Sequence, residues 1–294
     1  MLNRSDELIN AMNSRGSTHS TDSGFKKEIS LFGGVSILGG IMVGSGIFYL
    51  GSYVLIRTGM SLSLALLSWI LGGVVSLLGG ICYAELGASD PRAGGMTVYL
   101  NNAYSPVVGF LNGFTSWLIG GPGSIAAIAI ALPSAFTVII PMGEWTIKFA
   151  AISLIIGLTI VNYFGVKFGS KLQNISMVAK LIPIGIIMVL GLLFGEVSPD
   201  LSLTPETTDI SFGSIISMVS FAVIASLWAY EGWTNLNTVA EELKNPRKNL
   251  PLAIIISIVS ITGLYTLFNY SIYRVIPFNE IESLIANNEY YLGS

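Results

Sequence analysis

Apolar residues along the chain gather in long blocks separated by short polar segments. The charge-poor blocks lie near residues 31–56, 62–84, 106–137, 145–164, 173–194, 212–237 and 251–273. A block of about 20 apolar residues is enough to cross the hydrocarbon of a bilayer as an α-helix. Because lipid cannot bond to exposed peptide groups, each block must close its backbone hydrogen bonds internally. The pattern therefore predicts an all-α integral membrane protein with seven spans.

The third block allows two interpretations. No Asp, Glu, Lys or Arg occurs between Ala93 and Gly143, and "GGPG" at 120–123 has the composition of a hairpin turn. Dividing the block there leaves Pro106–Ile119, which is too short to span comfortably. We therefore expect one long, tilted helix over 106–137, kinked near Pro122.

Composition supports the membrane class and excludes several kinds of function. Of the 294 residues, 52% are hydrophobic and 11% are charged, whereas soluble domains carry about 25% charged residues. Cys82 is the only cysteine, and the only histidine is His19, in the polar N-terminal segment. A disulfide framework, most metal sites and an intramembrane Ser–His pair are thereby excluded, and no cofactor is expected. The net charge of −3 indicates no nucleic-acid partner.

Orientation follows from the basic residues. Residues 1–28 are polar and lack the apolar core of a signal peptide, so we expect a mostly disordered cytoplasmic tail, with the transmembrane domain over 29–294. This arrangement puts inside the cell Arg4, Arg15, Lys26, Lys27, Arg92, Lys167, Lys171, Lys244, Arg247 and Lys248. Only Arg57, Lys148 and Arg274 then lie outside. The bias predicts a multi-pass protein of the cell membrane whose N-terminus is cytoplasmic and whose last residues lie outside.

Gly44-Ser45-Gly46 stands in the middle of the first block, where a helix breaker is unexpected. Gly40 and Gly44 form a small-xxx-small pair, which lets membrane helices pack closely. Alternatively, the helix is interrupted, and its freed amides and carbonyls line a polar cavity that holds a substrate. The second interpretation requires another broken helix.

The sixth block contains a candidate for that second break. Glu231 and Gly232 interrupt an apolar stretch flanked by Trp228, Tyr230 and Trp233. A membrane carboxylate costs about 3 kcal/mol on insertion scales unless it faces a polar cavity, so Glu231 is a candidate functional residue. It is also explained as a carboxylate that bonds to nearby backbone or to an adjacent helix.

Lys180 in the fifth block is the other charge expected within the membrane. It lies eight residues after Leu172, about 12 Å along a helix, which is too far to reach the interface easily. An ammonium fixed in the bundle can occupy the place of a coupling ion. It can equally be a structural partner for carbonyls at a helix end.

Three stretches resemble the L-type amino acid transporters of the amino acid, polyamine and organocation superfamily, and are similar to bacterial serine/threonine exchangers. They are "GSGIF" at 44–48, "YAELGASDPRAGG" at 83–95 and "AYEGWTNLNTVAEELKNPRKNLPLAI" at 229–254. The resemblance implies a LeuT-like inverted-repeat fold of twelve helices, with helices one and six interrupted. It also implies secondary active transport of amino acids by alternating access, as a uniporter, an exchanger or a proton-linked carrier.

The resemblance further implies a substrate site. Amides around Gly44, Ser45 and Gly46 would bind the carboxylate of the amino acid. Its ammonium would meet carbonyls near Met42 and those of Trp228, Ala229 and Glu231. Trp228 stands where relatives often have Phe and would cap the pocket from outside, while Lys180 matches a fifth-helix lysine that replaces sodium.

Two features depart from the family pattern. Glu231 occupies a position where relatives vary, so we expect its side chain to affect selectivity toward small or polar substrates. The chain also stops after the seventh span, at "NNEYYLGS", where the family continues through five more helices. The first repeat plus helices six and seven would leave the pocket open, so we expect a truncated, weakly active or inactive transporter that lacks its C-terminal half or relies on a homo-oligomer.

Three rival functions remain open at the level of sequence. A membrane-embedded serine hydrolase would need Lys180 within hydrogen-bond reach of Ser45. A non-transporting scaffold fragment would bind a partner helix and no substrate. A channel is disfavoured because the polar groups cluster at one depth.

Overall fold

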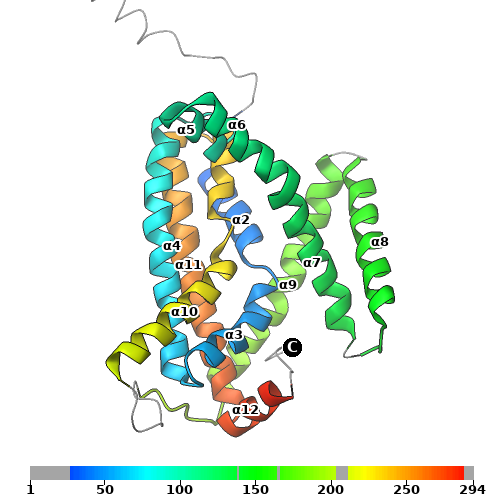
Figure 1. Ribbon diagram of the computed structural model, residues 1–294, viewed down its shortest axis with the longest axis vertical. Helices are drawn as coiled ribbons and strands as arrows, with labels where there is room; N and C mark the ends of the chain where they lie inside the picture. The colour runs from blue at the N-terminus through cyan, green and yellow to red at the C-terminus, as the bar shows by residue number, and fades with distance from the viewer. Residues whose placement is uncertain (1–26, 138, 164–165, 203–210, 288–294) are drawn as a thin grey trace, which may run out of the picture.

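The computed structural model describes residues 27–137, 139–163, 166–202 and 211–287, with the backbone alone at 162 and 166–174. The described residues form a bundle of helices (Figure 1). Apart from residues 27 and 28, the expected cytoplasmic tail lies outside the described ranges.

In chain order, the helices are α2 (Leu31–Met42), α3 (Gly46–Arg57), α4 (Leu62–Ser89), α5 (Met96–Ala103), α6 (Pro106–Thr115), the π-helical turn η1 (Ser116–Gly120), α7 (Gly121–Phe136), α8 (Glu144–Tyr163), α9 (Val166–Phe194), α10 (Phe212–Tyr230), the 3-10 helix η2 (Trp233–Glu242), α11 (Pro246–Val275) and α12 (Phe278–Ala286). The long helices run along the bundle, while α5 and α12 lie across its ends (Figure 1). Within the described ranges, 6 helical runs are long and apolar enough to cross a membrane, or 7 when the bent pair α2 and α3 is one span. The predicted all-α membrane class is confirmed.

Serine residues mark the start of several of these helices. The side chains of Ser30, Ser61, Ser105 and Ser211 accept hydrogen bonds from backbone N–H groups in the first turns of α2, α4, α6 and α10. The first N–H groups of a helix have no partner within the helix, and a serine at this position satisfies one of them.

Several helix boundaries differ from the expected spans. α4 continues past residue 84 to Ser89, and α9 begins at Val166 rather than 173. Asn245-Pro246, a pair that ends helices in many proteins, instead opens α11, because proline is tolerated in a first turn, where no N–H is needed. A charge-poor block predicts only the part of a helix that lies in the hydrocarbon. Backbone hydrogen bonding extends the helix beyond that part, into the polar interface.

The third expected span is a continuous helical run, Pro106–Phe136. Its irregularity is the π-helical turn η1, which precedes Pro122. Pro122 itself lies in the first turn of α7, so the backbone departs from regular α geometry a few residues before the expected kink.

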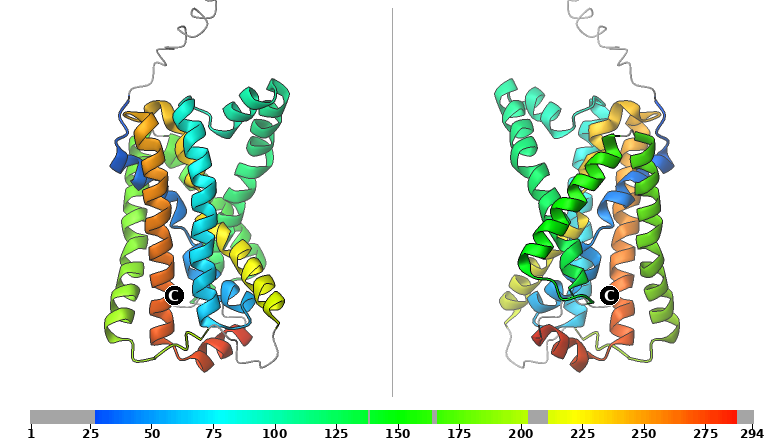
Figure 2. Two further views of the ribbon diagram at one scale, coloured as in Figure 1. Left: turned by 90° about the vertical axis from the view of Figure 1, so that its left-hand side faces the viewer. Right: turned by 90° about the vertical axis from the view of Figure 1, so that its right-hand side faces the viewer.

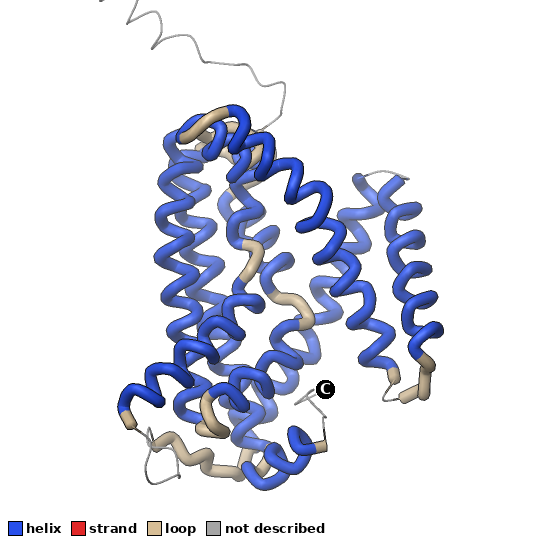
Figure 3. The backbone as a smooth tube through the Cα atoms, in the orientation of Figure 1, coloured by secondary structure: helices blue, strands red, loops and turns tan. Residues whose placement is uncertain are grey.

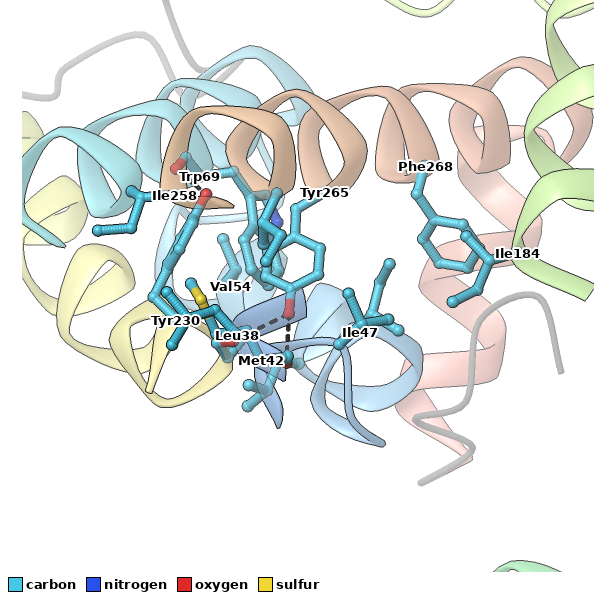
Figure 4. Packing of buried hydrophobic residues seen from close by; sticks show 14 of the residues in the cluster. Leu38, Met42, Ile47, Val54, Trp69, Ile184, Tyr230, Ile258, Tyr265 and Phe268 are labelled. Carbon is cyan, nitrogen blue, oxygen red and sulfur yellow. Dashed lines mark hydrogen bonds between the residues drawn. The ribbon is translucent and has the colours of Figure 1, made fainter. Parts of the chain in front are cut away.

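The core lies between α4 and α11, which run side by side in both views, with α2 and α10 packed against them (Figures 1 and 2). Large side chains such as Trp69, Tyr265 and Phe268 are fully buried there (Figure 4). α7 and α8 lie to one side of this core (Figure 1), and aromatic side chains such as Trp117 and Phe149 are exposed on the outer helices. Exposed apolar surface of this extent is expected of helices that face lipid.

Two sets of contacts define the ends of the bundle. At one end, Ile29 pairs with Leu243 in a parallel bridge, and Gly94 N donates to Thr238 O at 3.1 Å. At the other end, Val197 N donates to Arg274 O at 3.0 Å. Arg92, Lys244, Arg247 and Lys248 therefore lie near the end where α2 begins, and the basic residues expected outside lie toward the opposite end.

Candidate functional site

The first break separates α2 from α3. α2 ends at Met42 and α3 begins at Gly46, and their axes differ in direction by 57°. The resulting loop lies midway along the bundle (Figure 3). Carbonyls at the end of α2 and N–H groups at the start of α3 therefore lack partners within a helix.

The glycines of this break have different roles. A Cβ added at Gly46 would meet the Ala229 Cα atom at 3.5 Å, so Gly46 allows close packing against α10. A Cβ added at Gly44 would meet only the Met42 carbonyl oxygen, at 3.9 Å. Close packing thus explains Gly46, whereas at Gly44 the interrupted backbone itself is the relevant feature.

The second break separates α10 from η2. Glu231 is extended, with φ −63° and ψ 145°, and Gly232 has a φ of 119°. A left-handed φ is readily adopted by glycine and costly for other residues. A Cβ at Gly232 would also meet the Ile41 Cγ2 atom at 2.5 Å, so the two breaks lie against each other.

Tyr265 of α11 contacts both breaks. Its hydroxyl lies 2.7 Å from the Met42 carbonyl oxygen and 2.9 Å from the Ala229 carbonyl oxygen (Figure 4). Its side chain is fully buried. Sequence reasoning missed this residue, because a tyrosine in an apolar helix has no local signal that distinguishes it from an ordinary core residue.

Lys180 of α9 reaches the first break from another side. Its Nζ atom donates a hydrogen bond to the Gly40 carbonyl oxygen at 2.7 Å, in the last turn of α2. Helix C-termini carry about half a negative charge, which an ammonium offsets. Within the described part of the chain no hydrogen bond joins Lys180 to Ser45, so a lysine-activated serine is not formed here.

A cavity of about 580 Å³ lies where the breaks meet the third span. It is lined by Ile41, Met42, Gly44, Ser45, Gly46, Ser116, Gly120, Gly121, Ser124, Ile128, Trp228, Ala229, Glu231, Gly232 and Asn235. Every residue to which the resemblance assigns substrate binding lies in this lining. Lys180 is not part of it but bonds to the backbone behind it.

Sequence reasoning missed the wall that the third span contributes. Ser116, Gly120, Gly121 and Ser124 come from η1 and the start of α7. The available signal was the glycine pair followed by Pro122, which by itself predicts only a kink. π-helical turns occur frequently at functional sites, because the extra residue per turn frees backbone groups.

The charge of the cavity is negative. Glu231 is exposed to it, and its carboxylate has no hydrogen bond or ion pair to any described residue. The lining residues include no lysine, arginine or histidine, and Trp228 is 50% exposed beside Glu231. A positively charged or hydrogen-bond-donating ligand therefore suits this space better than an anion.

Past the second break, η2 is fixed to neighbouring segments. The Asn237 amide donates to the Tyr83 carbonyl oxygen and to the Tyr99 hydroxyl, each at 3.0 Å. Near the same end, Arg92 donates two hydrogen bonds to the Asp90 carboxylate. The bonds from Arg92 lower the pKa of the Asp90 carboxyl below its ordinary value.

Comparison with known proteins places these features in a family. The sequence profile of the amino acid permease family matches residues 29–292. The chain is 34% identical over 269 residues to the serine/threonine exchanger SteT of Bacillus subtilis, covering 92% of this chain and 60% of that protein. It is 36% identical over 263 residues to the b(0,+)-type amino acid transporter 1 of Homo sapiens, covering 87% and 53%.

A third relative is the large neutral amino acids transporter small subunit 2 of Rattus norvegicus, 36% identical over 250 residues, with 83% of this chain and 46% of that protein covered. The chain therefore spans about half the length of the curated relatives it matches. These relatives are named as transporters or exchangers, which argues against a membrane hydrolase. From the profile match and these identities, the chain belongs to the amino acid permease family, as an L-type-transporter-like member of the amino acid, polyamine and organocation superfamily.

Proposed function

We propose that this protein binds an amino acid in the cavity between its two breaks and serves amino acid transport across the cell membrane by alternating access. The observation that carries the proposal is the meeting of two helix C-termini, of α2 and α10, with the N-terminus of α3 at one cavity. Helix C-termini attract cations and helix N-termini attract anions. A zwitterionic α-amino acid supplies one of each.

The polar ends of the substrate are assigned to backbone groups. Amides around Gly44, Ser45 and Gly46 bind the carboxylate, as backbone N–H groups at helix N-termini do in other anion sites. Carbonyls of Met42, Trp228, Ala229 and Glu231 bind the ammonium. Membrane transporters commonly use discontinuous helices in this way, because an interrupted backbone is tolerated where it lines a cavity.

The side chain of the substrate then meets a wall of mixed character. Ser116 and Ser124 offer hydroxyls, Glu231 offers a carboxylate, and Trp228 and Ile128 offer apolar surface. This lining favours small or polar side chains and disfavours acidic ones, since no base is present to pair with them. A second hollow, on α9, has only apolar and glycine residues in its lining and offers no comparable polar groups.

Lys180 contacts the proposed site at the end of α2, on the side away from the cavity. Its ammonium neutralises the C-terminus of α2 through the Gly40 carbonyl, a place that a bound cation would otherwise suit. We therefore expect binding and transport that do not depend on sodium. We further infer that the N-terminus lies in the cytoplasm, in keeping with the basic residues near the end where α2 begins.

The name of the Bacillus subtilis relative suggests the first substrates to test. The purified chain in nanodiscs is mixed with radiolabelled L-serine or L-threonine, and binding is measured with sodium or with choline as the cation. Uptake is then measured in liposomes preloaded with unlabelled serine, which distinguishes exchange from uniport, and with a pH gradient. We expect saturable binding in either cation.

The Glu231→Gln variant provides the matched control for selectivity. Because it keeps the size of the side chain and removes its charge, it should retain binding of serine and change the order of preference among neutral and basic amino acids. Absence of binding to a folded wild-type chain, across all twenty amino acids, would contradict the proposed function and favour the scaffold alternative. An unchanged order of preference would contradict the role of Glu231.

A further inference from the structure

We propose that Asn235 is a specificity-determining residue of the cavity, whose side-chain amide binds the hydroxyl or carboxamide group of a polar substrate side chain. This inference rests on the proposed function and concerns the part of the substrate that the backbone groups of the breaks do not bind. Asn235 lies in the first turn of η2, is exposed and lines the cavity. No sequence pattern distinguished it from its neighbours.

The orientation of the Asn235 amide is set by its own turn. The backbone N–H of Asn235 and its Nδ2 atom both donate to the Gly232 carbonyl oxygen, at 3.0 Å and 3.1 Å. A carbonyl oxygen only accepts hydrogen bonds, so the amide nitrogen faces Gly232 and the amide oxygen faces away from it. No described residue donates a hydrogen bond to that amide oxygen. Both lone pairs of the Gly232 carbonyl are occupied, so the acceptor that this turn offers to a ligand is Asn235 Oδ1.

The rest of η2 holds Asn235 in this position. Leu236 and Asn237 are fully buried, and the Asn237 amide is bonded to α4 and α5. The Thr238 hydroxyl donates to the Asn235 carbonyl oxygen at 2.6 Å. Rotation of η2 that removed Asn235 from the cavity would break the bonds of Asn237. The amide is therefore fixed in place before a ligand binds.

The chemistry of a primary amide determines which substrate side chains it suits. Its oxygen accepts a hydrogen bond and its second N–H donates one, so it pairs with groups that do both, such as a hydroxyl or a carboxamide. An apolar side chain of the same size would displace water from Asn235 and leave the amide oxygen unpaired, which is costly. Asn235 thus favours serine-like substrates over apolar ones of equal size.

The test compares Asn235→Leu with Thr238→Val in nanodiscs. Leucine is similar in size to asparagine and removes the amide, whereas Thr238→Val removes a hydrogen bond within η2 from a residue outside the cavity lining. Dissociation constants are measured for radiolabelled L-serine and for radiolabelled L-2-aminobutyrate, which carries a methyl group in place of the serine hydroxyl. The ratio of the two constants gives the serine preference.

We expect the wild type to bind L-serine about fivefold more tightly than L-2-aminobutyrate, because one neutral hydrogen bond distinguishes the two ligands. Asn235→Leu should abolish this preference, and Thr238→Val should keep it. A merely structural role of Asn235 would weaken both ligands equally and leave the preference as in the wild type. That result, no preference in the wild type, or an equal loss of preference in Thr238→Val would each overturn the inference.

Failure of the proposed function gives a different result. A folded wild-type chain that binds neither ligand, nor any other amino acid, contradicts the proposed function itself. Should Asn235→Leu fail to fold, Asn235→Ala removes the same amide without adding bulk and should also abolish the preference. A folded Asn235→Ala protein that keeps the serine preference would overturn the inference in that case.

Discussion

Lys180 and Tyr265 reach the first break from different helices and satisfy different carbonyls. Lys180 bonds to Gly40 from α9, whereas Tyr265 bonds to Met42 from α11. Each donor offsets the partial negative charge that gathers at the end of α2. The break is therefore held by specific side chains, and single substitutions should affect it measurably.

Lys180→Met is expected to reduce substrate affinity by about tenfold with little loss of stability. The substitution removes the bond to Gly40, but it also removes the cost of keeping an ammonium within the membrane, and these effects on stability oppose each other. Binding of radiolabelled serine and the thermal unfolding temperature are measured together. Lys148→Met is the control, because Lys148 pairs with Glu144 at an exposed position, where an ion pair contributes little. A large fall in unfolding temperature with unchanged affinity would indicate a structural role alone.

Asp90 predicts a pH dependence of stability. The bonds from Arg92 hold the pKa of the folded carboxyl below the unfolded value of 3.8. Stability from this pair is therefore present above the unfolded pKa and is lost as pH falls through the folded pKa. Thermal unfolding is followed for the wild type and Asp90→Asn from neutral to acidic pH. The unfolding temperature of the wild type should exceed that of Asp90→Asn at neutral pH, and this difference should disappear only at acidic pH. A difference that does not change with pH would contradict a stabilising Asp90–Arg92 pair.

Among the elements, the two broken helices show what local sequence can and cannot specify. Gly44 and Gly232 mark the breaks, because glycine leaves the helix at little cost. The ends of α4, α9 and α11 were less predictable, since hydrogen bonding extends each helix beyond its charge-poor block. The π-helical turn η1 was also missed, because the glycines and proline near it are compatible with several local geometries.

Gly232→Ala tests the second break. Alanine would hold a φ of 119°, and its Cβ would press against Ile41, so we expect a loss of about 1–3 kcal/mol in stability together with weaker serine binding. Gly263→Ala is the control, because a Cβ at Gly263 meets nothing within 4 Å and its backbone is helical. Thermal unfolding in detergent measures the first effect and radioligand binding the second. Equal behaviour of the two variants would show that the break tolerates a side chain.

At the scale of the whole molecule, segments that are far apart in the sequence contact each other at the two ends of the bundle. Ile29, Gly94 and Leu243 meet at one end, and Val197 and Arg274 meet at the other. The cavity lies between these ends, where both breaks interrupt the bundle (Figure 3). A site between the two ends is the arrangement that alternating access requires.

The proposed orientation predicts labelling from one side only. In a Cys82→Ser background, Ser89→Cys should react with a membrane-impermeant maleimide from the cytoplasmic face, because it lies at the end where α2 begins. Gly143→Cys, which precedes α8 at the opposite end, should react from the outer face. Intact cells and inside-out vesicles provide the two faces. Labelling of Ser89→Cys in intact cells would contradict the proposed topology and indicate the opposite orientation.

The amino-acid sequence alone predicted the membrane class and marked the residues of the two candidate breaks, but it left close helix packing as an alternative for the first. These features depend on hydrophobic blocks and on glycine backbones, which act over a few neighbouring residues. The tertiary structure was required for the Tyr265 bridge, the bond from Lys180 to Gly40 and the cavity wall of η1 and α7. The Tyr265 and Lys180 contacts join positions 223 and 140 residues apart. Such pairs form only when packing brings α2, α9 and α11 together, and no local pattern encodes which donor will meet which carbonyl.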